Sequence, residues 1–490
     1  MSFPTESLGP SPPYAFWLLH VFSPNPKSEC IELSFCNKVD NMDRVSNLPD
    51  ELLCHILSFF STKEAALTTV LSKRWRNLFV SGSNLDIDDS EFLHPEEGKR
   101  ERGRILDSFM EFVDRVLALQ LISTINKVSL KCRTGVDANR VDHWIYNALA
   151  RGVTDLDLCI VFGSSRYWLY PRGFESRKLV KLKIGSGIDL VEFCAGYKLK
   201  MLLPACPALE ELEMYDVKGL DSNETVSSAS LKNLIIKSSL VSSGSFSFDT
   251  PRLVYLGYSD FIPADYPLAN LQNLSEARIN ISLTDDQVER ARFPNEYNDE
   301  YDDAVRLVNM AKLMSGIRNV QTLCFNSTTL EVLSLCCESM PVFNNLKVLV
   351  FYSGQSRWQA VPVLLKNCPH LETLCITGLL HVVTETCGDV CDCIPREDKG
   401  RSITSCQVKR IEIEGFIGTM RETTMISHFL EYFPCLEELL ITVEGNCPRQ
   451  FDVPEATDFR AQMLELYYKS LSCNVKLHGC ESLLRKLTAQ

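Results

Sequence analysis

The sequence predicts an α/β protein in which a short helical module precedes a long solenoid of parallel strands. Two observations support this prediction. An apolar-x-x-apolar-x-apolar pattern recurs twelve times between residues 125 and 441, and a short strand recurring about every 20–29 residues is typical of a leucine-rich repeat solenoid. Ahead of the repeats, residues 43–83 instead carry apolar residues at helical spacing.

Length and composition limit the function classes. A chain of 490 residues is too long for one ordinary core, so about two to four domains are expected. A net charge of −13 argues against a nucleic-acid partner held by phosphate contacts. No apolar run reaches the ~20 residues that a membrane span needs, so no membrane partner is expected.

The N-terminal residues 1–41 are rich in proline and serine and lack a periodic apolar pattern, which predicts a disordered extension. Their short apolar run has no basic residue before it, unlike a secretory signal. The 20 cysteines are therefore expected as free thiols in the cytoplasm, the nucleus or both. Met42 directly precedes the helical module, so translation from Met1 and from Met42 both fit the sequence.

Residues 43–83 read as two or three short helices. Pro49 stands in the first helical turn, where proline is tolerated, and two acids follow it at the positive end of the helix dipole. Ser61 or Thr62 can cap the next helix. One apolar face comprises Leu52, Leu53, Ile56, Leu57 and Phe60, and later positions comprise Val70, Leu71, Trp75 and Leu78. A module of about 40 residues is rarely stable alone, so its second apolar face is expected to pack on the solenoid, on another protein or on both.

The repeats define the solenoid, which is expected over residues 85–367. The twelve copies begin at Ile125, Val153, Leu179, Leu209, Leu231, Leu253, Leu274, Val320, Leu346, Leu371, Val408 and Leu436, and the first seven are spaced by 21 to 30 residues. One such unit cannot bury its apolar side chains, whereas stacked units share a continuous core. The alternative is an ordinary leucine-rich α/β domain with chance matches, which twelve copies disfavour.

The interval from Leu274 to Val320 is long and contains an acidic insertion at about 284–304. Eight acidic and three basic residues lie between Asp285 and Arg306. We expect a solvated loop that leads into a helix from about Asp302, with Val305, Val308 and Leu313 on its buried face. The loop either keeps the chain soluble or contacts a partner.

Strand residues that point away from the core form the natural binding surface of a solenoid. Their charges alternate in sign, which again disfavours nucleic acid. Four of these positions are apolar: Val254, Tyr255, Val348 and Val350. They either lie under a loop or form a substrate-binding patch for a protein.

No catalytic motif is present: the sequence has no phosphate-binding loop, no G-x-S-x-G elbow and no H-E-x-x-H helix. The best metal candidates are His381, Cys387, Cys391 and Cys393, but structural zinc usually needs two close ligand pairs. Free thiols in a polar loop are the alternative. We therefore expect no catalytic residues, no metal and no cofactor.

Two segments resemble known families. "NLPDELLCHILSFFSTKEAALTTVLSKRWRNLF" closely resembles an F-box, which gives boundaries of 42–84. "CPHLETLCITG" and "VKRIEIEGFIGTM" lie in a region, 368–446, that resembles the FBD domain of plant F-box proteins, and residues 447–490 then form an associated tail. The order F-box, irregular leucine-rich repeats and FBD is that of this plant family.

This resemblance implies the substrate-recognition subunit of an SCF-type cullin ubiquitin ligase. The F-box would dock on a Skp-type adaptor and through it on a cullin, while the repeats and FBD would hold a substrate protein. The positions that match the adaptor-binding motif are Leu48, Pro49, Leu52, Leu53, Ile56, Leu57, Val70, Leu71 and Trp75. A leucine-rich-repeat interaction scaffold that does not assemble a ligase is the alternative.

Overall fold

The computed structural model describes residues 45, 47–92, 102–119, 125–133, 135–162, 165–170, 174–190, 198–217, 223–238, 244–292, 303–336, 340–354, 358–381, 407–417, 419–443 and 473–478. The predicted N-terminal extension, 1–41, and most of the predicted tail lie outside these residues. The chain divides into two compact units, Met1–Pro49 and Asp50–Gln490. Every helix and strand named below belongs to the second unit.

Three short helices open this unit: α2 (Asp50–Leu57), α3 (Thr62–Thr68) and α4 (Lys73–Val80). Ser61 caps α3 in a reciprocal capping box with Glu64, and the side chain of Ser72 caps α4 by accepting a hydrogen bond from the backbone N–H of Trp75. The second cap divides the later apolar segment into two helices.

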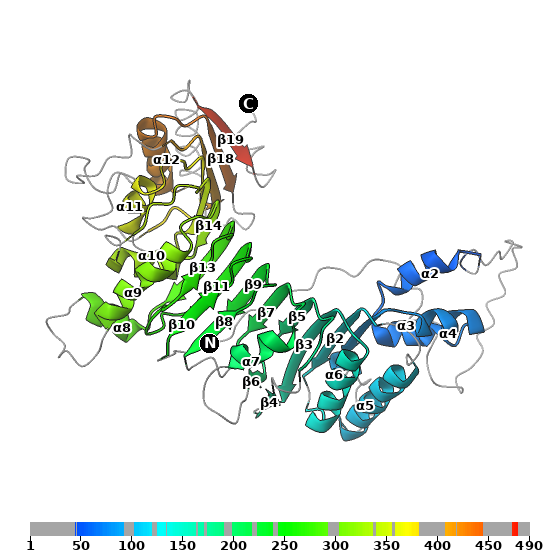
Figure 1. The fold of residues 1–490 in the computed structure, drawn as a ribbon. Helices are drawn as coiled ribbons and strands as arrows, with labels where there is room; N and C mark the ends of the chain where they lie inside the picture. The colour runs from blue at the N-terminus through cyan, green and yellow to red at the C-terminus, as the bar shows by residue number, and fades with distance from the viewer. Residues whose placement is uncertain are drawn as a thin grey trace, which may run out of the picture. The chain divides into compact units, whose positions relative to one another are not determined.

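The twelve predicted copies all form strands of one parallel sheet (Figure 1). The leucine-rich repeat prediction is therefore confirmed. In order across the sheet, the strands are β1 (Asn84–Asp88), β2 (Lys127–Cys132), β3 (Asp155–Phe162), β5 (Lys181–Ile184), β7 (Glu211–Tyr215), β9 (Asn233–Lys237), β11 (Tyr255–Phe261), β13 (Glu276–Ser282), β14 (Thr322–Phe325), β15 (Val348–Tyr352), β16 (Thr373–Thr377), β17 (Arg410–Phe416), β18 (Glu438–Val443) and β19 (Asn474–His478).

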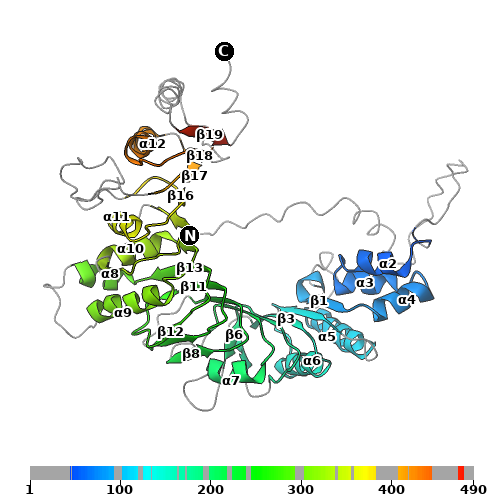
Figure 2. The ribbon, with the colours of Figure 1, turned by 45° about the horizontal axis from the view of Figure 1, so that its top comes forward.

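One face of the sheet is covered and supplies the core. The pattern's apolar positions are buried in every copy, and Leu156, Leu212 and Leu374, for example, are at most 1% exposed. The covering helices are the 3-10 helix η1 (Asp89–Phe92), α5 (Arg102–Leu119), α6 (Ala138–Ala150), α7 (Lys198–Ala205), α8 (Asp285–Arg292), α9 (Asp303–Gly316), α10 (Ser327–Cys336), α11 (Ala360–Lys366) and α12 (Met420–Tyr432). Figure 2 shows these helices beside the strands. None of the helices in the described part of the chain is long and apolar enough to span a bilayer.

Short strands complete the connections between repeats. β4 (Ser165–Leu169) pairs antiparallel with β3 and parallel with β6 (Ile188–Leu190). A second parallel sheet contains β8 (Glu224–Ser227), β10 (Phe246–Asp249) and β12 (Ala269–Asn270). Phe246 and Phe248 of β10 bury their rings against Tyr258 of β11.

The acidic insertion differs from the prediction. Its first part is the helix α8, and residues 293–302 lie outside the described residues. The following helix begins at Asp303, close to the predicted start, but Val308 is 62% exposed. Placing Val308 on the buried face was wrong, because the buried face of α9 runs through Met310, Leu313 and Met314.

The sheet continues across the boundaries that the sequence suggested. β15 and β16, on either side of residue 368, pair in parallel from Val348–Thr373 to Tyr352–Thr377. At the other end, β1 follows α4 after three residues and pairs with β2. The repeats and the residues that resemble an FBD therefore share one sheet.

Candidate protein-interaction surfaces

The three N-terminal helices divide their apolar residues between an interior and an exposed set. Leu53, Trp75 and Leu78 are 7% exposed or less and hold α2 and α4 together. An ion pair supports the same contact, because the guanidinium of Arg74 approaches the Asp50 carboxylate at 2.6 Å. The predicted adaptor-binding residues Leu53 and Trp75 are thus covered by the chain itself.

Five apolar side chains of this helical module remain largely exposed to solvent. They are Leu52, Phe59, Leu67, Val70 and Leu71, which we call the F-box apolar set, with exposed fractions of 49%, 75%, 50%, 66% and 49%. Exposed apolar clusters of this kind mark sites where another molecule binds. Of the remaining predicted positions, Ile56 and Leu57 are partly buried, Leu48 is partly buried and Pro49 is exposed.

The sequence motif included Leu52, Val70 and Leu71 but missed Leu67 and Phe59. Leu67 lies four residues before Leu71, which is the helical spacing that could have indicated it. Phe59 follows the end of α2 and stacks edge-on against His55, with ring centroids 4.9 Å apart.

The opposite side of the helices packs on the first strand of the solenoid. Ala65 and Phe79 belong to the same buried core as Leu85 and Ile87 of β1. The Thr62 hydroxyl accepts a hydrogen bond of 2.8 Å from the backbone N–H of Asp86. The module is therefore joined to the repeats by packing and by hydrogen bonds.

Further contacts at this junction involve Glu91. Ser61 donates to its carboxylate at 2.9 Å, and the Lys63 ammonium donates to its backbone carbonyl at 2.5 Å. The same ammonium lies 4.5 Å from the centroid of the Phe92 ring. Burial raises the pKa of the Glu91 carboxyl, and the hydrogen bond from Ser61 acts in the opposite direction.

The uncovered face of the sheet carries rows of charged side chains that pair from strand to strand. Lys181 on β5 lies 2.9 Å from Glu211 on β7, and the hydrogen bond to Glu211 raises the pKa of this lysine. The next pair, Lys183 and Glu213, is wider at 3.9 Å. Half-exposed pairs of this kind contribute little stability, about 0–1 kcal/mol, so they remain available to a binding partner.

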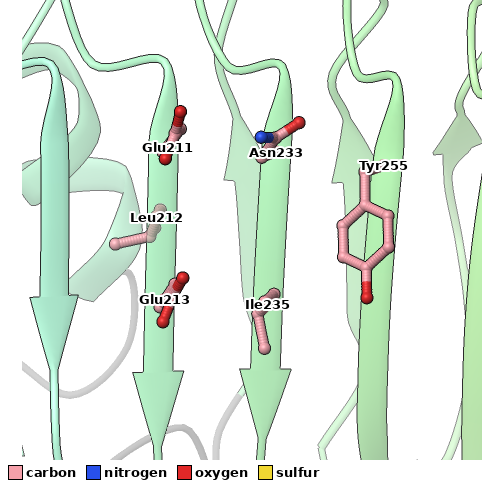
Figure 3. A pocket seen from close by; sticks show the side chains of 6 residues that line it. All are labelled: Glu211, Leu212, Glu213, Asn233, Ile235 and Tyr255. Atoms are coloured by element: carbon pink, nitrogen blue, oxygen red, sulfur yellow. The ribbon is translucent and has the colours of Figure 1, made fainter.

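A hollow of about 250 Å³ lies on this face across β7, β9 and β11 (Figure 3). We call it the Tyr255 hollow, and its lining residues are Glu211, Leu212, Glu213, Asn233, Ile235 and Tyr255. Asn233 of β9 is shorter than Glu211 and Tyr255 on either side of it, and Ile235 pairs with Gly257, which has no side chain, so the face is hollowed here. The hollow thus combines two carboxylates, an amide, an aliphatic floor and an aromatic ring.

The Tyr255 ring lies along β11, with its hydroxyl toward the end of the strand (Figure 3). Gly257, two residues on, has no side chain, and a Cβ there would stand 3.5 Å from the Tyr255 hydroxyl. Burial raises the pKa of Tyr255. Arg278 of β13 approaches the ring, with its guanidinium carbon 5.9 Å from the ring centroid.

The predicted substrate-binding residues separate into two groups on this face. Tyr255 lines the hollow, and Val254, which is 44% exposed, directly precedes it. Val348 and Val350 are half-buried on β15, three strands further along the sheet, which corresponds to about 14 Å at the usual strand spacing. The structure does not bring the four residues together into one patch.

The metal candidates can be traced only in part. His381 is buried and stacks on Trp358, with ring centroids 4.4 Å apart. Cys387, Cys391 and Cys393 lie outside the described residues. Within the described residues, no group of three histidine, cysteine or acidic side chains is placed to hold a metal ion.

An exposed apolar helical module joined to a repeat solenoid is typical of proteins that bind other proteins. Residues 45–85 match the F-box domain model. The chain is 54% identical to F-box protein At3g59000 of Arabidopsis thaliana, over 92% of this chain and 96% of that protein. Two F-box/LRR-repeat proteins of the same plant are similar: At5g38396 is 53% identical, over 89% of this chain and 98% of its own length, and At3g58930 is 51% identical, over 92% and 100%.

The chain therefore belongs to the family of F-box/LRR-repeat proteins. This membership supports the general role of an F-box adaptor in SCF-type ligases. The resemblance of residues 368–446 to an FBD domain stays a prediction.

Proposed function

We propose that this chain is the substrate-recognition subunit of an SCF-type cullin ubiquitin ligase. Its F-box docks on a Skp-type adaptor, which links it to a cullin, and its repeat and FBD-like region binds a substrate protein. The ubiquitin-transfer chemistry then belongs to other subunits, and this chain acts as a non-catalytic receptor. The observation that carries the proposal is the F-box apolar set, which stays exposed although its helices pack on the solenoid.

Within the matched motif, we assign the adaptor contact to the exposed positions Leu52, Val70 and Leu71, together with Leu67. Leu53 and Trp75 instead hold the helices in place, because they are buried inside the chain. Ile56 and Leu57 are partly buried, so we assign them both to the packing of the helices and to the adaptor contact. Leu48 and Pro49 remain part of the proposed adaptor contact through the motif alone.

The substrate protein is proposed to bind the uncovered sheet face, where Val254, Tyr255, Val348 and Val350 supply apolar contacts. We also propose that the protein works in the cytoplasm, the nucleus or both. The thiols of the buried Cys132 and Cys206 are free, which supports a reducing compartment.

Aspartate substitutions in the F-box apolar set test the adaptor contact. We expect Leu52→Asp with Val70→Asp to weaken binding to a purified Skp-type adaptor by about tenfold or more, because each aspartate would be desolvated without a partner. Isothermal titration calorimetry measures the change. Val308→Asp on α9 is a matched control, since Val308 and Val70 are similarly exposed, at 62% and 66%.

Two outcomes would count against this assignment. Full adaptor affinity in the double variant would show that the exposed set is not the contact. If the unmutated chain binds no adaptor while it still captures protein ligands, the interaction-scaffold alternative holds instead.

A further inference from the structure

The Tyr255 hollow has a specific chemistry that the proposed function leaves open. Its polar lining consists of two carboxylates and one amide, and no basic side chain is among the lining residues. Each carboxylate has one oxygen engaged: Oε2 of Glu211 with Lys181, and Oε2 of Glu213 with the Tyr215 hydroxyl at 3.0 Å. Within the described part of the chain, no hydrogen bond or ion pair involves the second oxygen of either carboxylate, so each can accept a hydrogen bond from a ligand.

The apolar part of the lining suits a long side chain with a polar end. Ile235 forms the floor between the carboxylates and the Tyr255 ring (Figure 3). An aliphatic stem can lie on such a floor while its charged end reaches polar groups. A hollow of about 250 Å³ is large enough for one such side chain.

The aromatic ring adds a preference for positive charge. A cation within about 6 Å of an aromatic ring is attracted by the ring's negative face. The chain already uses this interaction here, because Arg278 approaches Tyr255 at 5.9 Å while it pairs with Glu276 at 3.0 Å. Neighbouring Tyr215 likewise has the ammonium groups of Lys183 and Lys237 at 5.4 Å and 5.3 Å from its ring centroid.

We propose that the Tyr255 hollow binds a lysine or arginine side chain of a substrate protein. The stem of that side chain lies on Ile235, its cation faces Tyr255, and its N–H groups donate to Glu211 and Glu213. This inference rests on the proposed function, since it names a chemical feature of the substrate. It requires a positively charged side chain in the substrate, whereas the alternating charges on the rest of the uncovered sheet face favour neither sign.

A peptide library tests this inference without a known substrate. Random nine-residue peptides displayed on phage are selected on the full chain in complex with its Skp-type adaptor. We expect enriched peptides to share a lysine or arginine, and replacing that residue by norleucine in a synthetic peptide to abolish binding. The Glu211→Gln with Glu213→Gln variant and Tyr255→Leu should each bind the synthetic peptide about three- to tenfold more weakly.

Two further variants sharpen the test. Glu412→Gln, in the equivalent row on β17, is the matched control and should bind the peptide as the unmutated chain does. Lys183→Met removes the cation nearest Glu213 and should strengthen binding. Thermal melting of each variant shows whether it is folded, and all of the substituted side chains, Tyr255 included, are at least partly exposed.

The proposal is overturned if selection enriches no peptides, if the enriched peptides lack a basic residue, or if the variants of the hollow bind them unchanged. Adaptor capture, measured on the same preparations, separates this failure from that of the proposed function. If the unmutated chain does not bind the adaptor, the result counts against ligase assembly. If it binds the adaptor but no basic peptide, the result counts only against the proposal about the Tyr255 hollow.

Discussion

Asp260 shows how burial of one side chain makes stability depend on pH. This residue of β11 is 7% exposed, and its carboxylate accepts a hydrogen bond of 2.8 Å from the backbone N–H of Phe261. Burial raises its pKa to about 6 despite this bond. The folded chain therefore holds the proton more tightly than the unfolded chain, in which the pKa is about 3.9.

The sign of the pH effect follows from this pKa. The stabilising contribution of protonated Asp260 is complete below about pH 4 and is lost as pH rises through about 6. We expect Asp260→Asn to raise the free energy of unfolding at pH 7 by an amount on the order of 1–3 kcal/mol, because it removes a buried charge and keeps an acceptor for Phe261. Urea denaturation between pH 4 and pH 7 measures this. The same loss of stability with pH in both proteins would contradict the assignment.

At the scale of elements, the junction between the F-box and the solenoid depends on helix α3. Thr62→Val removes the acceptor of the Asp86 N–H and should lower the free energy of unfolding by about 1–2 kcal/mol, because a donor loses its partner. Thr69→Val is the matched control, since the Thr69 hydroxyl bonds only locally, to the Ala66 carbonyl at 2.6 Å. Denaturant midpoints compare the two variants. Equal effects would mean that the Thr62 bond does not support the junction.

Predictability from sequence also differs between elements. The strands of the repeats were predictable because each has three apolar positions, and these are the positions that enter the core. β1 and β19 were missed because Gly82 and Ser472 stand where the first apolar residue of the pattern would be. Helix α8 was missed because its sequence is mainly charged, and acidic segments resemble solvated loops.

The residues that form the interaction surfaces were less predictable from the sequence than the strands, because their exposure depends on how the elements pack. Leu52 and Leu53 are the same residue type on neighbouring positions, yet one is 49% exposed and the other fully buried. Only the packing of α2 on α4 decides between them. The Tyr255 hollow combines three strands that are about 20 residues apart in sequence, so its lining appears only once the register is known.

For the whole molecule, the continuous sheet predicts that the repeats and the FBD-like region stabilise each other. A chain that ends at Asn367 would lose β16 and expose Leu349 and Phe351, which are fully buried in the intact chain. Burying such side chains contributes about 1.5–3 kcal/mol each. We therefore expect this truncated chain to melt at least several degrees below the full chain, as differential scanning calorimetry would show.

A second truncation provides the comparison. A chain that ends at Val443 keeps every strand through β18 and removes only the edge strand β19 from the described sheet. Because each repeat contacts mainly its neighbours, this loss should be felt only at that edge and should shift the melting temperature much less. If the chain ending at Asn367 melts like the full chain, residues 368–446 form an independent domain, and the shared core that joins β15 to β16 contributes nothing to the stability of the repeats.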